Sequence, residues 1–365
     1  MNREIAIRAD VSAKIGFGHL KRCLSLAKAL KANGHRVRFV CRELGVDAQA
    51  QVARDGFDVM RLPEPGKFTP PPGSYPHAEW AGISEQDDAV QTCAVLAGSA
   101  TDLVIVDHYA FGSDWHRAVA AGTGAQLMVI DDLADRPIAA DWLVDHNYHP
   151  DHRAKYAGRL NPDARMMTGP LYAMLDPSYA DAPRYGFRQA VKSIGIFLGG
   201  IDAKGDSVRV LQAIRETGWD GAVEIVTTSA NPTLGILQDE AKKAGATMSI
   251  DLEGLAPFFA RHDLQIGAGG GAIWERCCIG APTVCLIIAE NQRASVPLLD
   301  GIGALLQYDL TAKASSQRQT LGETIERAVR DNELRNTMRT TAMDLVDGRG
   351  AHRIADAVSS ARRGL

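Results

Sequence analysis

Short apolar runs alternate with helix-length segments along the whole chain. In the first half, these runs predict strands at residues 5–7, 37–40, 103–106, 127–130 and 142–144. In the second half, they predict strands at residues 193–198, 223–226, 247–250, 264–266 and 284–288. Glycine, proline or charged residues bound the runs, which is typical of parallel strands in β-α-β units. Two such series in one chain predict an α/β protein with two doubly wound, Rossmann-like domains.

Breaks in this alternation indicate the domain boundaries. We expect an N-terminal α/β domain at residues 1–176, a linker at 177–191, a C-terminal α/β domain at 192–345, and a helix at 346–365 that packs back on the first domain. Ligands of doubly wound domains bind beyond the carboxyl ends of the strands, so we expect the two domains to face each other across a cleft. The segment from Pro63 to Gly82 lacks periodicity, which is typical of a functional lid or of an insertion.

Composition narrows the class of protein. The chain has 365 residues, 45% of them hydrophobic, and a net charge of −4 with acidic and basic residues well mixed. It therefore lacks the basic footprint of a nucleic-acid-binding protein. No apolar run approaches the roughly 20 residues of a membrane span, and charged residues interrupt the early apolar run that a signal peptide would need. We expect a cytoplasmic protein with no nucleic-acid or membrane partner, and nothing in the pattern predicts an oligomer.

A histidine stands at the start of the first predicted helix. The stretch before it contains Gly16 and Gly18, which allow a tight turn and the close approach of a ligand. The positive field of a helix N-terminus disfavours the imidazolium form, so a neutral His19 would be available to accept a proton. The alternative is that His19 only begins a helix. A dinucleotide fingerprint is not matched, because Lys21 occupies the place of its third glycine.

Polar side chains follow the predicted strands of the first domain. Asp10 follows the first strand, Asp107 to Tyr109 follow the run 103–106, and Asp131 with Asp132 follow the run 127–130. Because parallel strands end at one edge of a sheet, these side chains should form a shared polar floor. Some of the carboxylates would only cap helices or turns. Tyr109 is a candidate to bind a sugar hydroxyl or a phosphate oxygen.

Glycine runs follow two predicted strands of the second domain. The run from Gly267 ends in Gly269, Gly270 and Gly271 and leads into a helix that carries Trp274 and Glu275. Open backbone N–H groups beside a helix N-terminus would cradle a pyrophosphate, and Glu275 would accept hydrogen bonds from a ribose. Gly199 and Gly200 repeat this arrangement after another strand. The alternative for both runs is a role in tight turns only.

Metal and cofactor chemistry find little support in the sequence. The histidines between Asp145 and His152 are three residues apart, but Pro150 breaks any helix that would align them. The six cysteines form no C-x-x-C pair, which argues against a structural zinc site. We predict neither a metal site nor a cofactor.

Several motifs, taken together and in order, resemble the nucleotide-sugar hydrolases of pseudaminic acid biosynthesis, which act on UDP-2,4-diacetamido-2,4,6-trideoxy-β-L-altropyranose. The resemblance runs over most of the chain and rests on residues 7–10 with 15–19, 106–109, 130–133, 169–173, 198–200, 267–278 and 289–293.

That resemblance implies a fold and roles for individual residues. The fold would be the two-domain glycosyltransferase fold called GT-B, as in the GlcNAc transferase of peptidoglycan synthesis. His19 would be the catalytic base, Tyr109 would line the sugar pocket, and the 267–275 region would hold the nucleotide. Asn291 and Gln292 lie in the last matching motif and are candidate substrate contacts. Asp176 departs from the pattern, because a basic residue is expected there.

The function expected from this resemblance is hydrolysis of a UDP-sugar to UDP and free sugar. A water deprotonated by His19 would attack the anomeric carbon with inversion, while the glycine cradle stabilises the departing diphosphate. One alternative is a glycosyltransferase that uses the same cleft with a hydroxyl acceptor. Another is a non-catalytic protein that binds a nucleotide sugar.

Overall fold

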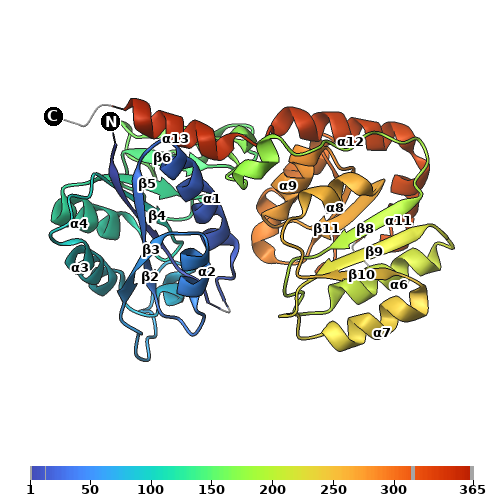
Figure 1. Cartoon of the computed structure of the whole chain (residues 1–365), viewed down its shortest axis with the longest axis horizontal. Helices are drawn as coiled ribbons and strands as arrows, with labels where there is room; N and C mark the ends of the chain where they lie inside the picture. The colour runs from blue at the N-terminus through green and yellow to red at the C-terminus, as the bar shows by residue number, and fades with distance from the viewer. Residues whose placement is uncertain (1, 13, 314–316, 362–365) are drawn as a thin grey trace. The chain divides into compact units, whose positions relative to one another are not determined.

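The computed structural model describes residues 2–12, 14–313 and 317–361. The chain divides into two compact units, one formed by Met1–Pro177 with Arg349–Leu365 and the other by Ser178–Gly348. Each unit is built on a single sheet of parallel strands that carries helices (Figure 1). The predicted fold class, two doubly wound α/β domains, is confirmed.

The first unit holds a seven-stranded sheet in the order β3-β2-β1-β4-β5-β6-β7. Its strands are β1 Glu4–Ala9, β2 Arg36–Arg42, β3 Asp58–Leu62, β4 Leu103–Asp107, β5 Gln126–Ile130, β6 Trp142–Asp145 and β7 Arg165–Thr168. Its helices are α1 Gly18–Ala32, α2 Ala48–Arg54, α3 Glu85–Leu96, α4 Ser113–Thr123, α5 His152–Lys155 and α13 Gly350–Ser360, with short 3-10 helices η1 Ala78–Ala81 and η2 Pro170–Tyr172.

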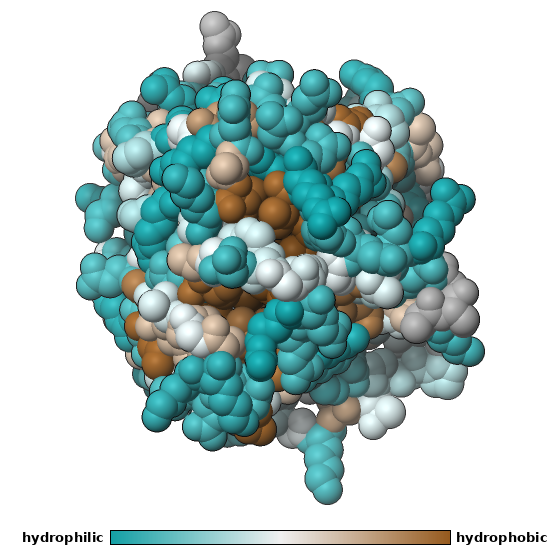
Figure 2. Space-filling view, turned by 90° about the vertical axis from the view of Figure 1, so that its right-hand side faces the viewer, coloured by the Kyte–Doolittle hydropathy of each residue, from teal (hydrophilic) through white to brown (hydrophobic). Residues whose placement is uncertain are grey.

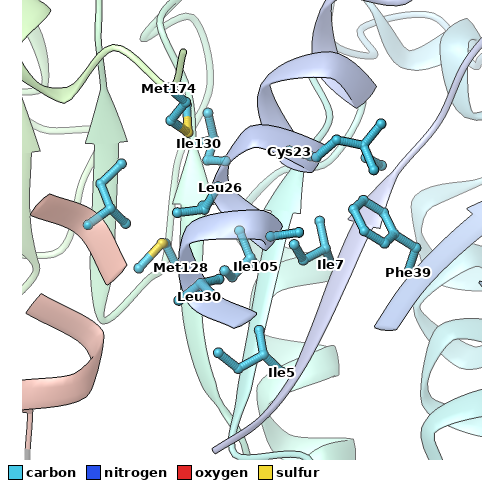
Figure 3. Close-up of a cluster of buried hydrophobic side chains, with 14 of the residues drawn as sticks. Ile5, Ile7, Cys23, Leu26, Leu30, Phe39, Ile105, Met128, Ile130 and Met174 are labelled. Atoms are coloured by element: carbon cyan, nitrogen blue, oxygen red, sulfur yellow. The ribbon is translucent and has the colours of Figure 1, made fainter. Parts of the chain in front are cut away.

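Alternation along β1 builds the core of this unit on both faces of the sheet. Ile5 and Ile7 are paired with Leu103 and Ile105 of β4, and all four are fully buried. In Figure 3, Ile5, Ile7 and Ile105 lie with Leu26 and Leu30 of α1 in one apolar cluster, which the close-up shows from the side of the helix. Ala6 faces the opposite cluster, which packs against α3 and α4. Truncating a side chain of this kind, for example by Leu26→Ala, costs about 2–5 kcal/mol.

Helix α13 is part of the first unit although it follows the second in sequence. Its buried side chains Ala351, Ile354, Ala355 and Val358 lie in the same apolar cluster as those of α1. The short distance between the two helices is visible in Figure 1. Residues from the two ends of the chain therefore share one core.

The second unit holds a six-stranded sheet in the order β10-β9-β8-β11-β12-β13. Its strands are β8 Ser193–Phe197, β9 Ala222–Thr227, β10 Thr247–Ile250, β11 Leu264–Ala268, β12 Thr283–Ile287 and β13 Leu306–Asp309. Its helices are α6 Asp206–Glu216, α7 Leu234–Ala244, α8 Ala256–Arg261, α9 Ala272–Ile279, α10 Val296–Gly301, α11 Leu321–Arg330 and α12 Asn332–Leu345, with η4 Glu290–Ala294. The 3-10 helix η3, Pro177–Ala180, spans the boundary between the units.

Two segments expected to be irregular have defined places. Residues 177–191, the expected linker, pack with the second unit: Tyr185 is buried, and its N–H donates to the carbonyl of Ile279 at 2.7 Å. The 63–82 segment is irregular up to His77 and then forms η1.

Most of the surface seen in Figure 2 is hydrophilic, and hydrophobic surface shows in separate areas between the hydrophilic side chains. Within the part of the chain that the structure describes, every helix is too short or too polar to cross a bilayer.

Candidate active site

The strand order of the first unit places His19 near the switch point of the sheet. The sheet order reverses between β1 and β4, so the chain leaves these two neighbouring strands toward opposite faces, and doubly wound sheets bind their ligands beyond the carboxyl ends of the strands at such a point. His19 is the second residue of α1, which follows β1, and Asp107 is the last residue of β4. The topology thus brings together two residues that are 88 positions apart.

His19, Asp107 and Arg22 form a hydrogen-bonded group. The Nδ1 atom of His19 lies 2.6 Å from Oδ1 of Asp107. Arg22 donates from Nε to Oδ2 and from Nη2 to Oδ1 of the same carboxylate, both at 2.6 Å. Asp107 is 1% exposed and His19 is 8% exposed. Burial opposes ionisation of Asp107, but the charges and hydrogen bonds of Arg22 and His19 hold its pKa far below the ordinary value.

This arrangement fixes the tautomer of His19. An ionised carboxylate can only accept, so the imidazole donates from Nδ1 and leaves Nε2 as an acceptor. A buried carboxylate that orients a histidine in this way is the usual support of a general base. In the sequence, only the helix N-terminus pointed to His19; neither Asp107 as the orienting group nor Arg22 could be recognised there.

Tyr109 and Asp132 extend the group. Tyr109 donates its hydroxyl to Oδ1 of Asp132, and Nδ2 of Asn147 donates to Oδ2 of the same carboxylate at 3.0 Å. Burial and the charge of Asp132 raise the pKa of Tyr109 well above its ordinary value, so the phenol keeps its proton. The Tyr109 ring meets the His19 ring edge-on, with 4.7 Å between centroids. The predicted polar floor therefore includes Tyr109 and Asp132.

Residues of the 63–82 segment complete this side of the site. The rings of His77 and Trp80 lie 4.5 Å apart, and Trp80 also meets Tyr109 at 5.6 Å and His19 at 6.1 Å. We call His77, Trp80 and Tyr109 the aromatic cluster. No motif in the sequence pointed to His77 or Trp80, because the residues that they contact, His19 and Tyr109, are distant in the sequence.

Asp10 has a structural role beneath the site. It is fully buried, and its carboxylate accepts from both terminal nitrogens of Arg8 and from the N–H of Arg42 at 2.5–2.8 Å. Nε2 of His108 lies 3.3 Å from Oδ2 of Asp10. Arg8 and Arg42 also pair with buried Asp88. Its oxygens accept from these protein donors, so the geometry assigns Asp10 to the support of Arg8 and Arg42; its predicted contact with substrate stays a prediction.

Gly16 lies in the turn that leads into α1, and Gly18 is the first residue of that helix. Gly16 has a φ of +73°, which glycine adopts readily, and its N–H donates to the carbonyl of Ser12 at 2.8 Å. A Cβ atom added to Gly16 or to Gly18 would meet no atom within 4 Å. Between them, Phe17 is 47% exposed. This turn therefore leaves open space beside His19.

The glycine turn of the second unit lies at the corresponding place in its sheet. Strand order reverses between β8 and β11, and Gly199 to Gly200 and Gly269 to Gly271 follow these two strands. Gly269 is tightly packed: its N–H donates to the carbonyl of Leu286, and an added Cβ would lie 2.5 Å from Cγ2 of Val296.

The next two glycines differ from Gly269. Added Cβ atoms at Gly270 and Gly271 would meet nothing, and no described residue accepts a hydrogen bond from their N–H groups. These N–H groups precede the N-terminus of α9, where the helix dipole favours an anion. The turn suits a phosphate group.

The other predicted nucleotide contacts lie on α9, in η4 and in the turn after β8. Trp274 and Glu275 lie on the first turn of α9 and are buried. In η4, Gln292 accepts from the N–H of Ile288 at 2.9 Å and packs beside Gly269, whereas Asn291 is exposed. Gly199 has a φ of +99°.

The remaining turn residue of this unit has a role in the fold. Gly200 accepts from the Thr228 hydroxyl at 2.7 Å through its carbonyl, which fixes the turn after β8. An added Cβ at Gly200 would lie 3.0 Å from Cγ2 of Thr228, so the glycine also allows this close packing.

The 145–152 segment, with its histidines, and Asp176 form hydrogen bonds and ion pairs within the first unit. Asp145 accepts from Nζ of Lys155 at 2.7 Å, and His152 lies 3.7 Å from the same oxygen. In the described ranges, no group of three or more His, Cys, Asp or Glu side chains is placed to hold a metal ion. Asp176, the departure from the family pattern, pairs with Lys28 at 2.9 Å.

Comparison with known proteins supports the resemblance. No protein-family model matches the chain. It is 24% identical to the UDP-2,4-diacetamido-2,4,6-trideoxy-β-L-altropyranose hydrolase of Campylobacter jejuni over 306 residues, which are 84% of this chain and 99% of that protein. It is 23% identical to the spore coat polysaccharide biosynthesis protein SpsG of Bacillus subtilis over 354 residues, 96% of each chain.

Solved structures share the fold. MurG of Acinetobacter baumannii matches with a TM-score of 0.66 and 16% identity, covering 98% of this chain and all of MurG. UGT89C1 of Arabidopsis thaliana, solved with UDP-L-rhamnose, matches with a TM-score of 0.63 and 12% identity over 99% of each chain. These matches confirm the predicted GT-B fold.

Proposed function

We propose that the chain is a nucleotide-sugar hydrolase that cleaves UDP-2,4-diacetamido-2,4,6-trideoxy-β-L-altropyranose into UDP and the free sugar. The observation that carries the proposal is the 2.6 Å contact between His19 and a buried, Arg22-held Asp107, which leaves Nε2 of the imidazole as a proton acceptor. The substrate is inferred from the similar hydrolase of Campylobacter jejuni, of which the similarity covers 99%.

In the proposed reaction, water is the nucleophile. Its oxygen forms a bond to the anomeric carbon while the bond from that carbon to the diphosphate oxygen breaks. The proton of the water passes to Nε2 of His19, and Asp107 stabilises the imidazolium that results. The electron pair of the broken bond leaves with UDP, and the anomeric centre is inverted.

The two units divide the work in this proposal. The first supplies the base and, through Tyr109 and Asp132, hydrogen-bonding groups for the sugar. The second supplies the N–H groups of Gly270 and Gly271 for the diphosphate, whose charge grows as the bond breaks. Glu275, on the first turn of α9, would contact the ribose.

A glycosyltransferase is the second candidate, because the solved structures with this fold include CalG4, the calicheamicin glycosyltransferase. In that case, a hydroxyl acceptor replaces water and the same base removes its proton.

The deciding experiment is incubation of the protein with the UDP-sugar and no acceptor, followed by NMR of the products. Free sugar and UDP support hydrolysis. Substrate that is unchanged until an acceptor is added supports transfer, and substrate that stays bound but intact under both conditions supports a binding protein. The matched control is His19→Asn, which should abolish turnover by removing the base and leave UDP affinity nearly unchanged.

A further inference from the structure

Arg276 is a buried cation without a carboxylate partner. It lies on α9 and is 1% exposed. Its Nη2 atom donates to the carbonyl of Ala268 at 2.7 Å. Its Nε and Nη1 atoms have no hydrogen-bond partner in the described ranges, and no ion pair joins it to a described Asp or Glu. Burying a charge is costly unless an opposite charge offsets it.

The other arginines that are less than 2% exposed are compensated. Arg8, Arg42 and Arg136 each pair with a buried aspartate at 2.5–2.7 Å. Arg335 lacks a carboxylate, but it donates to three backbone carbonyls, two of them in the last turn of α11, the negative end of that helix. By contrast, within the described ranges Arg276 donates to one carbonyl, and its other partner of opposite polarity is the ring face of Phe259, whose centroid lies 6.0 Å from Cζ.

Neighbouring thiols do not supply the missing charge. Burial raises the pKa of Cys277 to about 12 and that of Cys285 to about 11, although the Arg276 charge acts in the opposite direction on both. Both groups therefore stay neutral thiols at pH 7. No thiolate therefore lies beside the buried Arg276 guanidinium.

The sequence makes room for this cation behind the glycine turn. A Cβ atom added to Gly267 would lie 2.3 Å from Nη1 of Arg276 and 2.9 Å from the carbonyl oxygen of Phe197. Gly267 is thus required by the arginine and by close strand packing, a role different from the anion cradle expected for the whole run. Ala268, which Arg276 holds, directly precedes the turn with the open N–H groups of Gly270 and Gly271.

We propose that Arg276 is a positioning residue for the nucleotide, and that its buried charge is offset by a diphosphate bound at the Gly269–Gly271 turn. This inference rests on the proposed function, in which the second unit binds UDP. A buried charge is weakly screened by water and salt, so it attracts the diphosphate without touching it. It gives no comparable attraction to an uncharged nucleoside. Arg276 should therefore discriminate between UDP and uridine.

The test compares the wild type with Arg276→Gln and Arg276→Lys. Glutamine keeps a donor for the Ala268 carbonyl and removes the charge, whereas lysine keeps both. We expect Arg276→Gln to weaken UDP binding by about tenfold or more in calorimetry and to leave uridine binding, followed by saturation-transfer NMR, within about twofold. Arg276→Lys should restore most of the UDP affinity. The melting temperature of unliganded Arg276→Gln should equal or exceed that of the wild type, because an uncompensated charge has been removed.

Other outcomes overturn the inference. A purely structural arginine predicts a lower melting temperature, or no folded protein, with UDP and uridine weakened by the same factor. Unchanged UDP affinity in Arg276→Gln would also contradict it. If the wild type binds neither UDP nor uridine, it is the proposed function that fails.

Discussion

Replacing Asp107 with asparagine tests the proposed base most directly. Asparagine has nearly the same shape, but it is neutral and turns one acceptor oxygen into an NH2 donor. Oδ1 of Asp107 lies 2.6 Å from both His19 and Arg22, and Oδ2 accepts from Nε of Arg22. Either orientation of the amide therefore sets its NH2 against an N–H donor. His19 loses the group that orients its ring and fixes its tautomer.

The size of the effect follows from these contacts. Loss of a properly held general base costs ~10²–10⁴ in rate, so kcat should fall by at least about a hundredfold. Removing one partner of a buried ion pair costs about 3–5 kcal/mol. Arg22 keeps a 3.6 Å pair with Asp132 and its side chain is 14% exposed, so we expect the lower value. For a unit of this size, a loss of about 3 kcal/mol lowers the melting temperature by roughly 6–12 °C.

Three measurements check this prediction: kcat for release of UDP without an acceptor, the melting temperature, and UDP affinity. UDP affinity should hardly change, because the expected nucleotide contacts belong to the other unit. The matched control is Asp131→Asn, since Asp131 is also a buried carboxylate paired with a buried arginine, Arg136, at 2.7 Å. It should lose stability and keep kcat. A folded Asp107→Asn protein that retains more than half of the wild-type kcat would refute the assigned role of Asp107.

Three further predictions concern the nucleotide, the bond that breaks and acid stability. Gly270→Val should raise the Kd for UDP by about tenfold or more while leaving the melting temperature nearly unchanged, because the added Cβ atom meets no atom within 4 Å and the side chain covers open N–H groups; an unchanged Kd would contradict the placement of the diphosphate. Reaction in oxygen-18 water should label the free sugar, and label found in UDP by mass spectrometry would instead indicate attack at phosphorus. Burial raises the pKa of Glu224, but hydrogen bonds from Arg261, Ser249 and His262 lower it to about 2, below its ordinary 4.5. This stabilisation is complete above pH 4.5 and lost as the pH falls to 2, so the difference in melting temperature between wild type and Glu224→Gln should shrink over that range; a constant difference would show that the shift is absent.

Central strands were predictable from the sequence, and three of the four edge strands were not. All ten predicted strands are present: burial on both faces of a parallel sheet requires a continuous apolar run such as 127–130, and the one predicted edge strand is β10. The three missed strands, β3, β7 and β13, each lie at the edge of a sheet. An edge strand has one hydrogen-bonded neighbour and tolerates polar residues. In β7 and β13, the sequences Arg-Met-Met-Thr and Leu-Gln-Tyr-Asp therefore carry no strong strand signal.

Site residues were predictable only where the strand order brings them together. Parallel strands end at one edge, so Asp107, Tyr109 and Asp132 could be expected near His19. Whether a carboxylate faces the site or lies beneath it depends on its partners in space. Asp10 and Asp107 look alike in the sequence, yet Arg8 encloses the first and His19 meets the second. Trp80 reaches the site from an irregular segment, and such a path has no periodicity to reveal it.

Helix α13 has a consequence for how the protein is made. Four of its buried side chains belong to the core of the first unit, but they are translated only after the whole second unit, Ser178–Gly348. At roughly 5–20 residues per second, a ribosome needs about 10–30 s to synthesise that intervening stretch. During this interval, the nascent first unit lacks the buried side chains that α13 adds to its core beside α1. The second unit has no such dependence and can complete its own core first, so chaperone capture during translation should be directed at the amino-terminal unit.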